Sequence, residues 1–395
     1  MTPPLFIGSE IYRGSTYGAR HPLAIPRVST VMDLARALDW LPAAQYRPSP
    51  RAKPAALTAW HTPAYIAALQ QAEAAGHVDP ATRERHALGT LSNPVYPEVF
   101  RRPATGAGGV MLAADLLRDG GVVHVPGAGT HHALPDRANG FCYINDPVLA
   151  LLHLRALGLQ RIAYVDIDAH HCDGVEHGLA GAGDVLLISV HEENRWPFTG
   201  RLTDDGGGNA FNLPVPRGFN DTEMAAVRDR LILPALEAFA PQAVVLQCGA
   251  DAVAEDPLSR LALSNGAHAD MALALRAAAP RLLVLGGGGY NPWSVARCWV
   301  RVWGALNGQA IPDHLPEPAR AVLSALTWHR RGMGPVPRPG WVETLADPPC
   351  PGPLRGTVAE RIDTLRRRLP NLPGTMAALR ERPDTRRDAR RVDAP

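Results

Sequence analysis

The sequence is poor in lysine and lacks a concentrated basic region before its C-terminal end. Lys53 is the single lysine among 40 basic residues, and the others are arginines, which we attribute to coding bias in a GC-rich genome. The basic residues are nearly balanced by 38 acidic ones, and no group of arginines is interleaved with aromatic residues. Charge therefore gives no indication of nucleic-acid binding, and we expect no nucleic-acid partner.

Cysteines are few and show no paired spacing. Their number, five, is odd, and no two form a Cys-x-x-Cys motif, which argues against a disulfide framework and against a cysteine-based zinc site. The chain also lacks a signal-peptide pattern and any apolar run near the roughly 18 residues needed to cross a bilayer. We expect a soluble, cytoplasmic protein with reduced cysteines and no membrane partner.

The composition is that of an ordinary globular protein. Of 395 residues, 46% are hydrophobic and 20% are charged, which supplies material for a large core and excludes a disordered or collagen-like chain. Short apolar runs alternate with helical patterns, as in a parallel sheet flanked by helices. The expected strands are Gly121–Val125, Arg161–Ile167, Val185–His191, Ala243–Cys248 and Arg281–Leu285. The sequence predicts an open or doubly wound α/β fold, with three α/β/α layers around a mainly parallel sheet.

Polar side chains follow four of these strands, where such folds place their working residues. The pair His131 and His132 follows the first strand, and the segment Asp166–Asp173 follows the second. Asp251 and Tyr290 follow the last two strands. We therefore expect ionisable groups from four strand ends to meet at one rim of the sheet.

The composition changes beyond about residue 310, where proline and arginine become frequent. We predict a catalytic domain over residues 1–310 and a helical and loop extension over 311–379 packed against it. The tract 380–395 is rich in Arg, Asp and Pro without apolar periodicity, and we predict that it is disordered.

The densest chemical signal is the run Asp166-Ile167-Asp168-Ala169-His170. Alternate side chains at the end of a strand point the same way, so the two aspartates and the histidine can converge. Carboxylate and imidazole ligands suit a borderline divalent ion, and Asp251 is the natural third ligand, which leaves a position open for water. The alternative is a loop of solvated polar residues, and this run by itself does not decide between them.

Two further loops carry groups suited to catalysis. His131 and His132 lie on a glycine-rich loop, and each could serve as base and acid if oriented by a carboxylate such as Asp166 or Asp173. Taken alone, two adjacent histidines can equally be surface residues. Four glycines precede Tyr290, whose hydroxyl could donate to a developing oxyanion, although the same segment could be a flexible turn. Together these groups favour metal-assisted hydrolysis of a neutral carbonyl.

Nothing in the sequence favours cysteine catalysis. Cys142 and Cys172 lie close to the polar segments in the chain, but neither shows the spacing to histidine expected of a covalent nucleophile. We interpret both as packing residues.

Over roughly residues 5–310, the chain resembles the zinc-dependent histone deacetylase superfamily, in its bacterial branch related to acetoin-utilization deacetylases. Several motifs occur in the family's order, which makes the resemblance specific. They are HPLAIPR (21–27), WHTPAYI (60–66), GTHHALPDRANGFCYIND (129–146), YVDIDAHHCDGVE (164–176), QCGAD (247–251) and LGGGGYNPWSVARCW (285–299). The resemblance implies a single arginase/deacetylase-like domain and hydrolysis of an acetyl amide.

The resemblance also implies a role for each matching residue. Asp168, His170 and Asp251 would bind zinc, or alternatively iron. His131 and His132 would form a catalytic dyad paired with Asp166 and Asp173, with His132 doing the main acid and base work, and Tyr290 would polarise the acetyl carbonyl. Gly140 and Phe141 would line the tunnel, and Arg27 would lie at its foot, where acetate leaves. A structural monovalent cation, expected to be potassium, would be held by Ser189 and by the carbonyls of Asp166, Asp168, His170 and Val190.

The chain departs from the family pattern at two places. Ser92 stands where the family commonly has an aspartate that grips the substrate backbone. The segment Arg195–Gly200 replaces the usual aromatic-Pro-Gly-Thr-Gly, so that Pro197 or Phe198 could line the tunnel; we assign Phe198 to substrate binding. Both departures fall at positions that would contact the substrate.

These features bear on three candidate functions. The first is a deacetylase of acetyl-lysine in proteins. The second is a deacetylase of acetylpolyamines or other small acylated amines, which an acidic mouth built from Glu192, Glu193, Asp204 and Asp205 would favour. The third is a catalytically silent acyl-lysine binding protein, which the full set of site residues argues against. A ureohydrolase with two manganese ions is disfavoured because His171 stands where a bridging aspartate would be needed. The oligomeric state is not indicated by the sequence.

Overall fold

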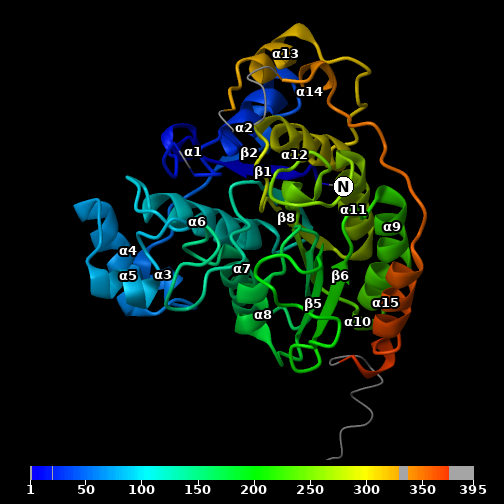
Figure 1. Ribbon diagram of the computed structural model, residues 1–395, viewed down its shortest axis with the longest axis horizontal. Coiled ribbons are helices and arrows are strands. Elements are labelled where there is room, and N and C mark those ends of the chain that lie inside the picture. The colour runs from blue at the N-terminus through cyan, green and yellow to red at the C-terminus, as the bar shows by residue number, and fades with distance from the viewer. Residues whose placement is uncertain (1, 20, 329–336, 373–395) are drawn as a thin grey trace, which may run out of the picture.

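A computed structural model describes residues 2–19, 21–328 and 337–372 and places eight strands in one sheet (Figure 1). All neighbouring strands pair in parallel. In sheet order the strands are β2 (Tyr46–Pro48), β1 (Leu5–Gly8), β3 (Gly121–Val125), β8 (Arg281–Leu285), β7 (Ala243–Gln247), β4 (Ile162–Asp166), β5 (Val185–Glu192) and β6 (Ala210–Val215). The predicted parallel α/β fold is confirmed.

Helices cover both faces of the sheet because successive strand residues point to opposite sides. In β4, Tyr164 packs on one face and Val165 on the other, each in its own buried cluster. The first face is covered by α6 (Arg101–Leu116), α7 (Asp146–Ala156) and α8 (Asp173–Leu179). The opposite face is covered by α9 (Asp221–Val227), η2 (Arg228–Ile232), α10 (Leu233–Phe239), α11 (Asn265–Ala278) and α15 (Gly356–Arg366). This arrangement gives the three expected layers.

Two smaller helical groups extend the domain beyond the sheet (Figure 1). One shares a tryptophan-rich core and contains α2 (Val28–Ala37), α12 (Pro292–Leu306), α13 (Glu317–Ser324) and α14 (Pro339–Glu343). The other contains α3 (Pro54–Leu57), α4 (Pro63–Ala75) and α5 (Pro80–His86). The remaining short elements are α1 (Ile11–Gly14), η1 (Ala43–Gln45), η3 (Ala250–Ala252) and η4 (Leu369–Asn371).

The five predicted strands are all present, and each bound lies within one residue of its prediction. Strands β1, β2 and β6 are present in addition to the five predicted strands. The first two have four and three residues, too few to show a pattern. The third is an edge strand interrupted by Asn212 and Pro214, and proline is tolerated at an edge because its missing N–H faces no partner strand.

The C-terminal part of the described chain packs on the domain. Val358, Ile362 and Leu365 of α15 are buried in the core that lies under α9 and α10. The domain boundary at residue 310 remains a prediction, and the predicted disordered tract 380–395 lies outside the described residues. Within the described parts of the chain, no helix combines the length and apolarity needed to cross a membrane.

Candidate active site

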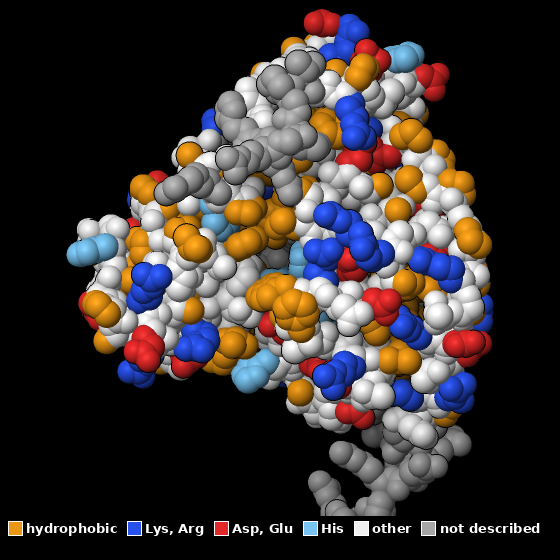
Figure 2. Space-filling view, viewed as in Figure 1, with side chains coloured by type: hydrophobic (Ala, Val, Ile, Leu, Met, Phe, Trp, Pro, Cys, Tyr) orange, Lys and Arg blue, Asp and Glu red, His pale blue; other side chains and the backbone are white. Residues whose placement is uncertain are grey.

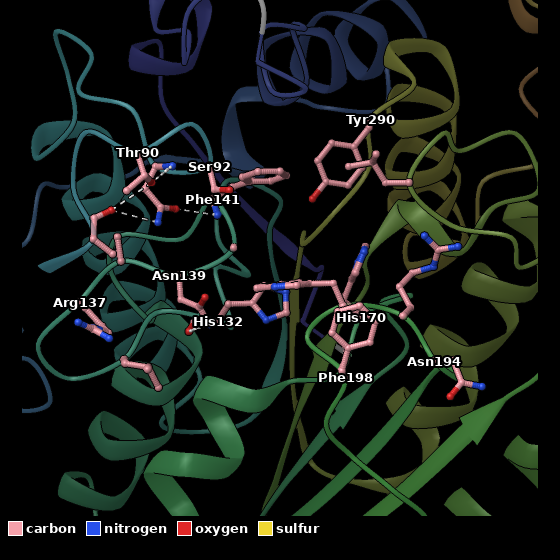
Figure 3. Close-up of a pocket in the computed structure, with 18 residues that line it drawn as sticks. Thr90, Ser92, His132, Arg137, Asn139, Phe141, His170, Asn194, Phe198 and Tyr290 are labelled. Atoms are coloured by element: carbon pink, nitrogen blue, oxygen red, sulfur yellow. Dashed lines mark hydrogen bonds between the residues drawn. The ribbon is translucent and has the colours of Figure 1, made fainter. Parts of the chain in front are cut away.

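The four strands that carry polar ends are neighbours in the sheet. Their order is β3, β8, β7 and β4, so the loops that follow them lie side by side at the carboxyl edge. Figure 3 shows side chains from these and nearby loops pointing into one cavity, among them His132, Phe141 and Tyr290. The site is therefore assembled from segments more than 150 residues apart in the sequence.

Asp168, His170 and Asp251 form a buried triad behind this cavity. The Nδ1 atom of His170 lies 2.9 Å from Oδ2 of Asp251 and 3.2 Å from Oδ1 of Asp168, and one ligand atom from each residue falls within 4.8 Å of the others. The neighbouring residues Ile167 and Ala169 point into the core, as the alternation predicted. The two aspartates and the histidine offer the oxygen and nitrogen ligands that a borderline divalent cation takes.

The backbone around the triad fits a metal centre. The N–H of Gly288 donates to Oδ2 of Asp168 at 2.7 Å, and the N–H of Ala169 donates to Oδ1 of Asp251 at 3.0 Å. A Cβ atom on Gly288 would lie 2.0 Å from Oδ2 of Asp251, so only glycine permits this approach. The N–H of His170 also donates to Oδ1 of Asp168 at 3.0 Å, so these bonds hold the ligand atoms of the triad within 4.8 Å of one another, where a cation could bind.

The charge of the triad also calls for a cation. Burial, followed by the negative charge of the nearby Asp168, raises the pKa of Asp251 to about 6. Burial opposes protonation of His170, but the two carboxylates outweigh it and raise the pKa of this imidazole to about 10. A divalent ion would supply the positive charge that the proton on His170 otherwise provides.

Each histidine of the predicted dyad is paired with its predicted carboxylate. Nδ1 of His131 lies 2.8 Å from Oδ2 of Asp166, and Nδ1 of His132 lies 2.6 Å from Oδ1 of Asp173. The two imidazole rings are 3.9 Å apart between centroids. These contacts orient both rings and direct the Nε2 atom of each away from its carboxylate.

Additional polar groups hold the two carboxylates, and the sequence analysis did not identify them. The hydroxyl of Tyr164 donates to Asp166 at 2.7 Å, and the side-chain amide of Asn139 donates to Asp173 at 3.0 Å. Tyr164 had a signal in the sequence, because it lies two residues before Asp166 on the same strand face. Asn139 had none, since it reaches Asp173 only through the folded loop.

The two dyad histidines have opposite pKa shifts. Burial disfavours the charged form of His131, but Asp166 and Asp168 overcome this and raise its pKa to about 9. Burial and the positive charge of His131 lower the pKa of His132 to about 4, against the influence of Asp173. At neutral pH, His131 is thus cationic, and His132 is neutral and able to accept a proton.

Tyr290 lies on the opposite wall of the cavity, at the end of the glycine-rich loop after β8. Its backbone N–H donates to the buried carboxylate of Asp256 at 2.6 Å, a contact that the sequence did not indicate. Burial, followed by the nearby Asp251 and Asp168, raises the pKa of Tyr290 well above its usual value. The hydroxyl therefore stays protonated and can donate a hydrogen bond at the site.

The cavity that leads to these groups has a volume of about 700 Å³ and includes Gly140 and Phe141 in its lining. Gly140 has a φ of +52°, and a Cβ atom there would lie 2.1 Å from the indole of Trp196. The Phe141 ring packs edge-on against Tyr290, with centroids 5.9 Å apart. Gly140 and Phe141 thus both line the cavity, and their contact with substrate stays a prediction.

Trp196 faces His132 and His170 from the other wall and is not among the predicted site residues. Its ring lies 4.6 Å from that of His132 and 6.3 Å from that of His170. Phe198 lines only the outer part, with 69% of its surface exposed, and Pro197 is not in the lining. The sequence carried a signal for Trp196, because Trp196-Pro197 matches the aromatic-Pro pair of the family motif. Phe198 therefore stands where that motif has its first glycine, and its φ is +63°.

Arg27 lies beyond the dyad, next to a smaller inner cavity. Its Nη1 atom donates to the carbonyl of Gly287 at 2.8 Å, and the side chain lines a space of about 30 Å³ together with His131 and Tyr290. Burial, followed by the positive charge of Arg102, lowers the pKa of this guanidinium from its usual value. The role of Arg27 in the release of acetate stays a prediction.

The remaining expected positions lie at the mouth and near β5. Ser92 lines the cavity, and its carbonyl lies 3.2 Å from Nε2 of His21, while the adjacent Asn93 accepts the N–H of Phe141 at 3.0 Å. Ser189 and Val190 are buried in β5, and Oγ of Ser189 lies 2.9 Å from Nδ1 of His191.

The structure does not bring together an acidic mouth from the four candidate residues. Glu192 is buried and held by Arg195 at 2.5 Å, and Glu193 pairs with Arg361 at 2.7 Å. Asp204 and Asp205 are likewise absent from the described lining of the cavity.

The comparisons with known proteins agree with this arrangement. A model of the histone deacetylase domain matches residues 21–306. The chain is 30% identical over 322 residues to the Acetoin utilization protein AcuC of Bacillus subtilis, covering 78% of this chain and 83% of that protein. It is 34% identical over 315 residues to Histone deacetylase 9 of Arabidopsis thaliana, covering 77% and 73%. The alignment with a Caenorhabditis elegans relative spans only 61% of that protein.

Solved structures show the same likeness. The crystal structure of an HDAC homologue from Aquifex aeolicus has a TM-score of 0.88 and 34% identity, covering 92% of this chain and 100% of that one. An HDAC homologue complexed with SAHA gives the same values. The fold and site define a hydrolase built on a parallel α/β sheet, with a buried triad that could hold a metal ion. The chain belongs to the histone deacetylase family, whose homologues are hydrolytic deacetylases acting on amides.

Proposed function

We propose that this chain is a metal-dependent deacetylase that hydrolyses the acetyl amide of N-acetyl-lysine in proteins, giving free lysine and acetate. The observation that carries the proposal is the buried Asp168–His170–Asp251 triad beside two carboxylate-oriented histidines at the base of a deep cavity. Family membership supports the amide hydrolysis. We infer the physiological substrate from the shape and charge of the cavity.

The triad would hold a divalent cation, for which we propose Zn²⁺, with Fe²⁺ as the alternative. When bound, such an ion lowers the pKa of a water molecule and polarises the amide carbonyl. Nε2 of the neutral His132 accepts a proton from the attacking water, while the cationic His131 stabilises negative charge nearby. The hydroxyl of Tyr290 donates to the oxyanion of the tetrahedral intermediate. The proton on Nε2 of His132 then passes to the leaving amine as the C–N bond breaks.

We also propose the structural potassium ion expected from the resemblance. The carbonyl oxygens of Asp168 and His170 receive no hydrogen bond from any described residue, which supports a cation near them. Ser189 and Val190 on the adjacent β5, with the carbonyl of Asp166, would complete its ligands. The five free cysteines support the proposed cytoplasmic location.

The test is hydrolysis of an acetyl-lysine peptide by the zinc-loaded protein, with N-acetylputrescine in parallel and His132→Ala as the inactive control. We expect peptide turnover that the substitution removes. Turnover of the polyamine alone would move the function to small-molecule metabolism, and the acid-free lining of the cavity argues against this. Zinc binding without turnover of either substrate would contradict the proposal and favour the silent binding protein.

A further inference from the structure

Large hydrophobic side chains are exposed around the opening of the cavity. The described residues include four exposed large hydrophobic side chains, and three lie at or beside this opening. They are Leu91, Trp196 and Phe198, exposed by 96%, 37% and 69%. Figure 2 shows hydrophobic side chains bordering the hollow at the centre of this face. An exposed apolar group of this kind at the mouth of a site marks a contact surface for a ligand.

The ring of Phe198 has no role in the packing of the fold. It belongs to none of the buried clusters, and its backbone adopts a left-handed conformation with a φ of +63°, which favours glycine. Because packing does not explain an exposed aromatic residue in this backbone conformation, contact with a ligand explains it better.

The charge at the opening is positive. Among the described residues that line the cavity are Arg137 and Arg195, and none is an aspartate or glutamate. Arg195 is neutralised by a two-point contact with Glu192, at 2.5 and 2.8 Å. Arg137 donates only to backbone carbonyls, those of Arg85 and Glu84, and no described carboxylate lies within ion-pair distance. Its positive charge is therefore not neutralised by a carboxylate and can repel a cationic group that enters the cavity.

We propose that this rim, formed by Leu91, Trp196, Phe198 and Arg137, is a specificity subsite for the peptide that flanks the acylated lysine. It binds a large apolar side chain next to that lysine and disfavours a basic one. The inference rests on the proposed function, since it concerns the neighbours of the residue that enters the cavity. Apolar contact with Phe198 and Trp196 supplies the attraction, and Arg137 supplies the repulsion.

The experiment compares three acetyl-lysine peptides of equal length whose flanking residues are Gly, Phe or Lys. Flankless N-acetyl-lysine methylamide is the fourth substrate. We expect kcat/KM for the Phe peptide to exceed that for the Gly peptide about tenfold, or ~1.4 kcal/mol. The Lys peptide should be several-fold worse than the Gly peptide at low ionic strength, and this difference should shrink in about 0.5 M salt.

Variants assign the effects to residues. Phe198→Gly should reduce the Phe-to-Gly ratio toward one, and its backbone suits glycine. Leu91→Ser gives a second variant at a fully exposed position, where loss of folding is not expected. Arg137→Gln should bring the Lys peptide up to the Gly peptide. Leu273→Ala removes the fourth exposed hydrophobic side chain, on α11 away from the opening, and should leave all ratios unchanged.

Failure of the subsite and failure of the proposed function give different results. If the flankless substrate is hydrolysed but the three peptides react equally well, the subsite is overturned and the proposed function stands. If Phe198→Gly and Leu91→Ser leave the Phe preference intact, the rim is likewise overturned. If none of the four substrates is hydrolysed, the proposed function itself fails, and the subsite with it.

Discussion

His124 is a buried histidine whose replacement by phenylalanine tests the electrostatics of the core. The residue lies in β3 with no exposed surface, and neither ring nitrogen has a hydrogen-bond partner among the described residues. Its ring contacts that of Phe6 edge-on at 5.5 Å, so a phenyl ring keeps the aromatic packing. We expect His124→Phe to make the protein more resistant to acid.

The magnitude follows from the pKa of this imidazole. Burial lowers the pKa of His124 from about 6.5 in the unfolded chain to about 3 in the folded one. Above pH 6.5 the ring is neutral in both states and its titration contributes nothing. Between pH 6.5 and 3 the unfolded chain binds one more proton, so stability falls by about 1.4 kcal/mol per pH unit. At pH 5 this loss amounts to about 2 kcal/mol.

The assay is urea unfolding of the wild-type and His124→Phe proteins at pH 7.5 and pH 5. Any change in packing shifts both measurements equally, whereas the titration of His124 shifts only the second. We expect the variant to gain about 2 kcal/mol on the wild type between the two pH values. An equal difference at both pH values would refute the reasoning, because His124 would then be protonated or hydrated inside the fold.

Three substitutions test the site. Asp173→Asn leaves His132 without its orienting carboxylate and should lower kcat by about 10²–10⁴ with little change in KM. Tyr290→Phe removes the hydroxyl donor but keeps the ring, and should lower kcat by about 10²–10³ without loss of thermal stability. Gly288→Ala places a Cβ atom against Asp251 and should weaken zinc binding by at least tenfold, as measured by competition with a chromogenic chelator.

Each of these expectations has a contrary result. A rise in KM with unchanged kcat in Asp173→Asn would mean that the carboxylate acts in binding rather than in proton transfer. Wild-type turnover in Tyr290→Phe would remove the hydroxyl from the chemistry. Wild-type zinc affinity in Gly288→Ala would show that the metal is held elsewhere.

Much of the fold was predictable because its central strands are buried on both faces. A run such as Val244-Val245-Leu246 has no polar residue, and this pattern identified the strands of the sheet's centre. The same logic placed Asp251 and Tyr290 at strand ends. Strands β1, β2 and β6 were not predictable because a short or interrupted segment pairs through its backbone, which leaves no pattern in the side chains.

The side chain that forms the second wall of the cavity could not be predicted from the sequence. The motif around Trp196 differs from the family pattern, and which ring faces His132 depends on how the loop crosses the site. The absence of acidic residues from the described lining of the cavity could not be predicted either. Glu192 is close in the sequence to the lining residues Asn194 and Arg195, but its side chain is buried against Arg195. Contacts between distant segments contribute to both features; the N–H of Arg260, for example, donates to Glu192 at 2.8 Å.

The central claim is that one metal ion held by Asp168, His170 and Asp251 supports amide hydrolysis. The direct test is to strip the protein with a chelator, titrate it with zinc, and follow bound zinc together with acetate release from an acetyl-lysine peptide. The account predicts that activity rises linearly up to one ion per chain and that Asp251→Ala neither retains zinc nor regains activity. Full activity in the stripped protein, or in Asp251→Ala, would contradict it.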